Sequence, residues 1–330
     1  MLNHSNAYMR KRAVITLYKL FTKYPDSISS AFPRLKERLG DEDPSVVCAT
    51  VSVICEMAHS NPKAYLPFVP QFFALLSVSH NWTLIKIVKL FATLTPHEPR
   101  LEKKLIKPLK AILEKTRAIS LVFEVVHTII TSGMIKAEAQ DDDLGNLCLE
   151  KLLSFLDQTD QNLKFLGLDA LSKLLLIRPT AGGSHREIIL KCLEDGDISI
   201  RMRALELVTT LVNEKTLFGI VKRLIVHLTS SISTSKIASQ ERVYRSRVVS
   251  FIITQCSKNN YSNLTNFEWF ISVICELVTF TGLSKEIGSL LGNTIIEVCI
   301  RVPETIPHAL SLLVEIFAHS NAILIGHIVE

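Results

Sequence analysis

The chain has 330 residues, of which 48% are hydrophobic and 21% are charged, a balance typical of a folded protein rather than a disordered one. Its net charge of +5 is small for this length and does not indicate a dedicated nucleic-acid binder. No stretch approaches the roughly 18 consecutive apolar residues of a transmembrane helix, and charges interrupt residues 1–12, where a secretory signal would be apolar. We therefore expect a folded cytosolic protein without a nucleic-acid partner.

Apolar residues recur at helical spacing and divide the chain into alternating segments, which we name A and B helices. The B helices are predicted at residues 7–23, 44–59, 81–94, 118–132, 161–177, 198–213, 238–257 and 284–301. The A helices are predicted at residues 31–40, 62–78, 98–116, 142–157, 185–195, 215–230, 264–281 and 305–319. Prolines at the proposed ends and glycines in the proposed turns support these boundaries. Because almost no segment alternates as a strand does, we expect an all-α fold.

One apolar pair marks seven of the B helices at a nearly constant interval. The pairs are Val14/Leu17, Val51/Ile54, Val88/Phe91, Val126/Ile129, Leu168/Leu171, Leu205/Val208 and Val248/Phe251. Their first members lie 37, 37, 38, 42, 37 and 43 residues apart, which is the period of a two-helix repeat. Since one repeat cannot bury its own apolar stripe, the repeats must stack on one another. The period predicts a right-handed α-solenoid of HEAT/armadillo-like two-helix repeats.

Polar and small residues recur at fixed distances from these pairs. Eight residues before each pair lies an expected helix cap: Asn6, Asp43, His80, Ala118, Asp160, Asp197 or Gln240. Asn and Asp suit this position because their side-chain oxygen accepts a hydrogen bond from an otherwise unpaired backbone N–H. Small residues stand directly before the pair in four repeats, at Ala13, Thr50, Gly167 and Ala204. Their size predicts that helix backbones approach closely there.

A solenoid has no single core, so its length sets the number of repeats rather than the number of domains. We predict one continuous array over residues 1–330 with about eight repeats. Two insertions, around residues 134–145 and 230–240, lengthen the period and are expected to form loops. The first B helix has no A helix before it, and the last apolar run has no polar capping repeat after it. We therefore expect a fragment of a longer array, truncated at both ends.

Motifs for catalysis or metal binding are missing from the sequence. There is no nucleophile elbow, phosphate-binding loop, zinc-protease helix or kinase signature, and the ten histidines are dispersed. The seven cysteines are scattered without a paired CxxC motif, so we expect reduced thiols rather than disulfides or a zinc site. The sequence thus predicts a protein that is not an enzyme and uses no cofactor or metal.

Two basic clusters are the candidate interaction sites. The first lies three and four residues apart on the predicted helix 98–116, so most members share one face: Lys103, Lys104, Lys107 and Lys110. This face is a candidate for binding a membrane through anionic phosphoinositide headgroups, or an acidic partner. The second cluster opens the predicted helix 238–257 and is a candidate contact with a neighbouring subunit: Arg242, Arg245 and Arg247. For both clusters, a merely solvated surface is the ordinary alternative.

The first part of the chain resembles a known family. The stretch Ala7-Tyr8-Met9-Arg10-Lys11-Arg12-Ala13-Val14, followed by Leu17-Tyr18-Lys19, is similar to the segment with which large adaptins begin a trunk repeat. Further similar stretches are Asp41-Glu42-Asp43-Pro44, Asn61-Pro62-Lys63, residues 81–91 and residues 94–101. Among large adaptins, these stretches look like the delta type, the large subunits of the third adaptor-protein complex. The resemblance is dense from Ala7 to Met134 and rests mainly on the repeat pattern beyond it.

This resemblance implies a non-enzymatic coat subunit that helps to sort membrane cargo from Golgi or endosomes to the lysosome or vacuole. It implies sigma, mu and beta-type adaptor subunits as partners, with an Arf-type small GTPase that recruits the complex. It also implies a cytoplasmic location, peripheral on the cytosolic face of Golgi and endosomal membranes. No cargo-binding residue can be carried over to this chain.

Two other HEAT-repeat scaffolds remain as alternatives. A karyopherin-type transport receptor would need acidic inner helices and grooves for Phe-Gly repeats, and the positive net charge disfavours it. The helical arm of a large lipid or protein kinase would be distinguished only by sequence beyond Glu330.

Overall fold

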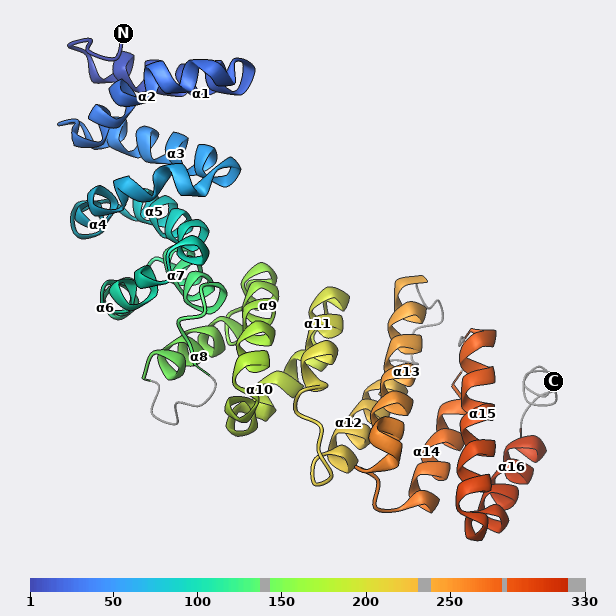
Figure 1. Cartoon of the computed structure of the whole chain (residues 1–330). Helices are drawn as coiled ribbons and strands as arrows, with labels where there is room; N and C mark the ends of the chain where they lie inside the picture. The colour runs from blue at the N-terminus through green and yellow to red at the C-terminus, as the bar shows by residue number, and fades with distance from the viewer. Residues whose placement is uncertain (137–142, 231–238, 281–283, 320–330) are drawn as a thin grey trace. The chain divides into compact units, whose positions relative to one another are not determined.

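A computed structural model describes residues 1–136, 143–230, 239–280 and 284–319 of the chain. These residues form sixteen α-helices, joined in places by short 3-10 turns, and contain no β-strand (Figure 1). The chain divides into two compact units, Met1–Ser154 and Phe155–Glu330. Within each unit, helix pairs stack on their neighbours in chain order.

In the first unit, four B helices pack one on the next: α1 (Ala7–Lys23), α3 (Pro44–Ser60), α5 (Asn81–Leu94) and α7 (Ile119–Thr131) (Figure 1). The A helices of the unit alternate with them along the chain: α2 (Ile28–Glu37), α4 (Val69–Val78), α6 (Arg100–Lys115) and α8 (Asp143–Leu156). Helix α7 ends at Thr131 and is followed by Ser132 and then Gly133, whose φ of +70° suits glycine. The N–H of Met134 then bonds to the carbonyl of Ile129, as in a Schellman C-cap.

The second unit repeats the same alternation. Its B helices are α9 (Gln161–Ile177), α11 (Ile198–Val208), α13 (Ser239–Tyr261) and α15 (Lys285–Arg301). Its A helices are α10 (Arg186–Lys191), α12 (Leu217–Ser230), α14 (Phe267–Val278) and α16 (Ile306–His319). The turn before α10 packs closely against Leu211 at Gly182. A Cβ added there would lie 2.6 Å from the Leu211 side chain.

Each predicted segment corresponds to one α-helix, so the all-α class and the A/B alternation are confirmed. The boundaries differ most at α4, which begins at Val69 instead of residue 62 because a 3-10 helix occupies Pro62–Phe68. Helix α10 is also shortened, because 3-10 turns flank it at Pro179–His185 and Cys192–Glu194. The expected loops around 134–145 and 230–240 lie largely outside the described residues. The right-handed sense of the stacking and the single continuous array over residues 1–330 remain predictions.

The recurring apolar pairs form the core of the stack. Of their fourteen members, thirteen are buried, and Leu17 of α1 is half-buried. Burying one such side chain contributes about 1.5–3 kcal/mol, so this stripe stabilises every B-helix contact in the stack. The small residues next to the pairs are also buried in three repeats, at Thr50, Gly167 and Ala204.

The predicted caps are confirmed where the side chain carries an acceptor in register. Four side chains accept a first-turn backbone hydrogen bond at 2.7–2.9 Å: Asn6, Asp43, Asp160 and Asp197. His80 and Ala118 occupy the N-cap position without a side-chain bond. The prediction for Gln240 is wrong, because α13 already begins at Ser239 and Gln240 is therefore inside the helix.

Candidate functional site

Helix α6 positions the first basic cluster. Every fourth residue of this helix is a buried leucine: Leu101, Leu105, Leu109 and Leu113. Residues three and four apart lie on one side of a helix, so the leucines form one buried side. The opposite side of α6 therefore faces solvent. Lys103, Lys104 and Lys107 are exposed there and form no ion pair within the described residues. We call these three residues the lysine face.

Lys110 is not equivalent to the other three lysines. Its Nζ lies 2.8 Å from Oδ2 of Asp143, the first residue of α8. This hydrogen bond raises the pKa of Lys110 and lowers that of Asp143. The contact joins one A helix to the next, so Lys110 takes part in packing while the lysine face stays available.

The second cluster is divided by the helical period of α13. Arg242 and Arg247 are exposed. Arg245, by contrast, is 2% exposed, so the prediction that it lies on the surface is wrong. The reason is geometric: at about 100° per residue, positions 242, 245 and 247 point in different directions, and Arg245 lies on the side that carries buried Tyr244 and Val249.

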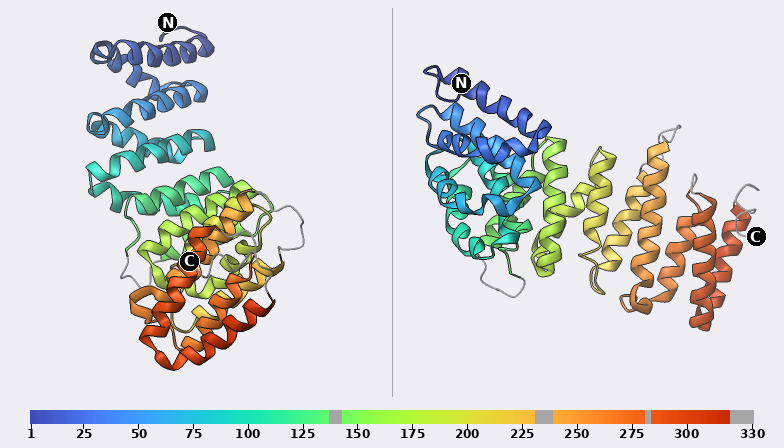
Figure 2. Two further views of the ribbon diagram at one scale, coloured as in Figure 1. Left: turned by 90° about the vertical axis from the view of Figure 1, so that its right-hand side faces the viewer. Right: turned by 45° about the horizontal axis from the view of Figure 1, so that its top comes forward.

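The two exposed arginines border an open groove of about 600 Å³. Helix α13 supplies most of its lining: Arg242, Val243, Ser246, Arg247 and Ser250. Met202 of α11 and Ser284, the N-cap residue of α15, complete it. These three B helices lie side by side in both sets of views (Figures 1 and 2). We call these seven residues the arginine groove.

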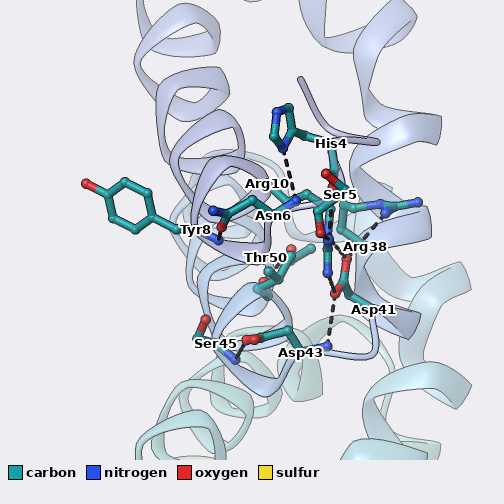
Figure 3. Close-up of polar contacts among 11 residues, drawn as sticks. His4, Ser5, Asn6, Tyr8, Arg10, Arg38, Asp41, Asp43, Ser45 and Thr50 are labelled. Carbon is teal, nitrogen blue, oxygen red and sulfur yellow. Dashed lines mark hydrogen bonds and ion pairs between the residues drawn. The ribbon is translucent and has the colours of Figure 1, made fainter.

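A polar junction that the sequence analysis missed connects α1 to the turn before α3 (Figure 3). The Arg10 guanidinium donates two hydrogen bonds to the Asp41 carboxylate, Nη2 to Oδ1 at 2.7 Å and Nε to Oδ2 at 2.9 Å. Asp41 also accepts the backbone N–H of Asp43 at 3.0 Å, and Asp43 in turn caps α3. The hydrogen bond from Arg10 is the main cause of the lowered pKa of Asp41.

The same junction recurs in the second unit, between α9 and the turn before α11. Lys164 Nζ lies 2.6 Å from Oδ2 of Asp195, and Oδ1 of Asp195 accepts the N–H of Asp197 at 3.0 Å. Burial raises the pKa of Asp195, but the hydrogen bonds from Lys164 and the Asp197 backbone outweigh it and lower the pKa overall.

Both junctions share a sequence signature. A basic residue stands four positions after one helix cap, an aspartate stands two positions before the next cap, and 31 residues separate them. Aligning the caps of the repeats would have revealed this pattern. We call the two arrangements Asp-x-Asp junctions, after the aspartate and the capping aspartate that follows it. Their charges are satisfied inside the stack, so they hold repeats together and offer no free ligand site.

A related basic residue forms a more buried network. Arg201 also stands four positions after its cap, but it pairs with Glu241 at the start of α13, Nη2 to Oε2 at 2.8 Å. Its guanidinium lies 4.4 Å from the Tyr244 ring centroid. Burial, assisted by the nearby Arg201 charge, lowers the pKa of His227 beside it. This cluster stabilises the contact of α11 with α13.

The described residues offer few other reactive groups. No set of three His, Cys, Asp or Glu side chains among them is arranged to hold a metal ion. The seven cysteines form no disulfide in this structure, and five of them are buried: Cys55, Cys148, Cys192, Cys256 and Cys275. Burial raises the pKa of Cys55 and of Cys256 to about 12, which keeps both protonated and unreactive near neutral pH.

None of the helices in the described part of the chain combines the length and apolar character needed to span a bilayer.

Comparison with known proteins identifies the family. The chain is 46% identical over 313 residues to the AP-3 complex subunit delta of Schizosaccharomyces pombe, covering 94% of this chain and 37% of that protein. It is 45% identical over 309 residues to the AP-3 complex subunit delta-1 of Bos taurus, covering 92% of this chain and 24% of that protein. The chain thus spans between about a quarter and two fifths of the length of these relatives.

A structural relative shows the same fold. A homology model of the full-length AP-3 complex in an intermediate open conformation contains a chain that matches with a TM-score of 0.76 and 31% identity. The match covers 96% of this chain and 58% of that one. The sequence model of the adaptin N-terminal region matches residues 1–324, and the chain therefore belongs to the adaptin N-terminal region family.

Proposed function

We propose that this chain is a non-enzymatic scaffold within the large, delta-type subunit of an AP-3 adaptor complex. The observation that carries the proposal is the 46% identity to a delta subunit over 94% of the chain, which extends through both compact units. The family match over residues 1–324 leaves the karyopherin and kinase-arm alternatives without support of their own.

The scaffold acts by presenting surface. Stacked B helices offer an extended area, and stable protein interfaces bury about 1,200–2,000 Å² in total. The apolar pairs and the Asp-x-Asp junctions keep neighbouring repeats in register, so side chains far apart in sequence hold fixed relative positions within a unit. Binding then depends on shape and charge over many residues rather than on one reactive group.

The proposed partners are the sigma, mu and beta-type subunits of the same complex, together with an Arf-type small GTPase. The proposed location is the cytoplasm, peripheral on the cytosolic face of Golgi and endosomal membranes, in transport to the lysosome or vacuole. The AP-3 relatives support an adaptor role, and the finer assignments follow from the family. We further propose that residues 1–330 belong to one continuous array within a longer subunit.

The two basic surfaces receive different roles in this proposal. The lysine face is assigned to anionic headgroups, because its three exposed charges lie on one solvent-facing side of α6. Each basic charge near an anionic surface contributes about 1 kcal/mol. Arg242 and Arg247 are assigned to a neighbouring subunit, because they border a groove between helices.

Affinity purification of the tagged protein from its native cells, followed by mass spectrometry, tests the scaffold role. We expect co-purification of sigma, mu and beta-type adaptor subunits at comparable amounts. Recovery of nuclear-transport components or of a kinase domain in their place would contradict the proposal, and cells that express the tag alone provide the control.

Vesicle co-sedimentation tests the lysine face. Lys103→Glu with Lys107→Glu should weaken binding to phosphoinositide vesicles, most clearly at low salt. The fold should survive, since exposed substitutions usually change stability by less than about 0.5 kcal/mol. Arg242→Glu with Arg247→Glu, which reverses the same number of charges, should sediment as the parent does. If the lysine variant sediments as the parent does, the lysine face has no role in membrane binding and is only a solvated surface.

A further inference from the structure

We propose that the arginine groove binds an extended acidic peptide segment of a partner protein, with a carboxylate placed at each of Arg242 and Arg247. The inference rests on the proposed subunit-contact role of these two arginines and specifies the chemistry of the segment they receive. It follows from the spacing of the arginines, their lack of ion pairs and the composition of the groove between them.

The spacing of the arginines matches an extended chain. On α13, Arg242, Ser246 and Ser250 form one row at intervals of four residues, and Val243 and Arg247 form an adjacent row. Five residues of helix rise by about 7.5 Å and turn by about 140°, so Arg242 and Arg247 flank Val243 and the two serines on opposite sides of the groove. Successive side chains of an extended peptide point to opposite sides of the chain. A peptide that runs along the groove can therefore direct acidic residues toward both guanidinium groups.

The charge of the groove is uncompensated. Arg242 and Arg247 form no ion pair within the described residues, whereas five other arginines of this unit are paired with carboxylates: Arg186, Arg201, Arg203, Arg223 and Arg301. Glu241, the acidic residue next to Arg242, is already bound by Arg201. A guanidinium presents a planar fork of N–H donors that fits a carboxylate with two parallel hydrogen bonds. A carboxylate from a partner can therefore bind the guanidinium groups that no carboxylate among the described residues pairs with.

The remaining lining fits a peptide better than a membrane. Val243 is 62% exposed at the centre of the α13 face, and Met202 is half-buried beside it. The apolar stems of glutamate side chains can cover these two residues. The hydroxyls of Ser246 and Ser250 can donate to peptide carbonyls. These contacts with a peptide backbone and with side-chain stems favour a peptide over a lipid headgroup, and the vesicle outcome named below distinguishes the two.

Fluorescence polarisation of the whole 330-residue chain tests the inference. The probe is a short fluorescein-labelled peptide of consecutive glutamates, which places carboxylates on both sides of an extended chain, and a peptide with glutamine in place of glutamate is its control. We expect saturable binding of the acidic peptide only. Arg242→Glu and Arg247→Glu should each weaken it by about tenfold, as expected for a lost charge-assisted hydrogen-bond pair.

Matched variants separate a specific site from general attraction. Lys191→Glu with Lys222→Glu reverses two exposed charges outside the groove, on α10 and α12, and should leave binding unchanged. Val243→Asp should weaken binding without changing the arginines. Circular dichroism and thermal melting confirm that each variant is folded.

Three results would overturn the inference: no saturable binding, equal weakening by the arginine and lysine pairs, or arginine-dependent binding to phosphoinositide vesicles without peptide binding. Failure of peptide binding together with intact recovery of adaptor subunits would reject this inference alone. Loss of the adaptor subunits with intact peptide binding would reject the scaffold role alone.

Discussion

The contact of α1 with α3 and the contact of α5 with α7 bury the same apolar stripe but use different polar chemistry. At the first, Arg10 and Asp41 have side chains only 13% and 2% exposed and are joined by two hydrogen bonds. At the second, the cap is Ala118, and Lys89 reaches Glu124 at 3.4 Å, with side chains 48% and 12% exposed. Because the lysine is solvated and the contact is longer, this pair should contribute less than the first, within the range of about 0–1 kcal/mol of solvent-exposed pairs.

This difference shows which part of the repeat the stack requires. Val126 and Ile129 of α7 are as buried as Val51 and Ile54 of α3, although no Asp-x-Asp junction precedes α7. The apolar pair is therefore the common requirement, and the polar junction is an addition present at some contacts only. Substitutions that separate the two contributions test this conclusion.

Overpacking of the shared apolar contact should have the largest effect. Ala204 is fully buried directly before the Leu205/Val208 pair, so Ala204→Leu should lower the free energy of unfolding by up to about 3 kcal/mol. Chemical denaturation measures it. Ala13→Leu, at the aligned but half-buried position of α1, is the matched control and should cost less. An unchanged midpoint for Ala204→Leu would show that the backbones do not approach closely there.

Removal of one Asp-x-Asp junction should have the next largest effect. Asp41→Ala leaves Arg10 without its carboxylate and should reduce the free energy of unfolding by about 1.5 kcal/mol, the lower end for hydrogen bonds to charged groups. Glu124→Ala removes the weaker pair and should cost less. Equal losses in the two denaturation curves would contradict the distinction between the contacts.

The junctions should also make stability depend on pH in the acid range. The pKa values of Asp41 and Asp195 are lowered in the folded chain, so their contribution is present above the unfolded value near 3.8 and is lost as pH falls through the folded values. Melting temperatures between neutral pH and about pH 3 should therefore decline at the acid end. Asp41→Asn should make that decline shallower, and an identical profile would remove Asp41 as a cause.

Introducing a side-chain cap at α7, at the contact of α5 with α7, should change the stability least. Ala118 already stands at the N-cap of α7 with extended backbone, so Ala118→Asp can accept a first-turn N–H and should stabilise the chain by about 1 kcal/mol. Asp43→Ala should cost a similar amount at α3. Thermal melting of both variants provides the comparison, and a loss of stability in Ala118→Asp would show that the helix start is not free to accept a carboxylate.

The sequence predicted what repeats, and it failed where a contact depends on three-dimensional register. Periodicity located every helix, because a buried pair such as Val88/Phe91 leaves a regular apolar signal. The Arg10–Asp41 contact leaves no apolar signal, since its members are charged, lie 31 residues apart and stand out only when the caps of the repeats are aligned. Lys110 and Asp143, 33 residues apart on successive A helices, likewise leave no apolar signal.

The candidate sites were predicted less completely than the fold. The exposure of Lys103 and Lys107 follows from the leucine stripe of α6, so the sequence was sufficient there. Arg245 was misplaced because its neighbours Tyr244 and Ser246 are not strongly apolar, and the buried side of α13 could not be read at its first turns. The arginine groove was not predictable, because Met202 and Ser284 join it from other helices.

The Asp-x-Asp junction lets one repeat be exchanged for another without loss of the polar contact between neighbours. Arg10 and Lys164 are alternative donors at one aligned position, and Asp41 and Asp195 are equivalent acceptors at another. A B helix that carries such a donor in its first turns is therefore chemically compatible with any following B helix that is preceded by such an acceptor, whatever their other residues. Shuffled or duplicated repeats joined at these points would keep their electrostatic match, which gives an engineer natural places to lengthen or shorten the solenoid.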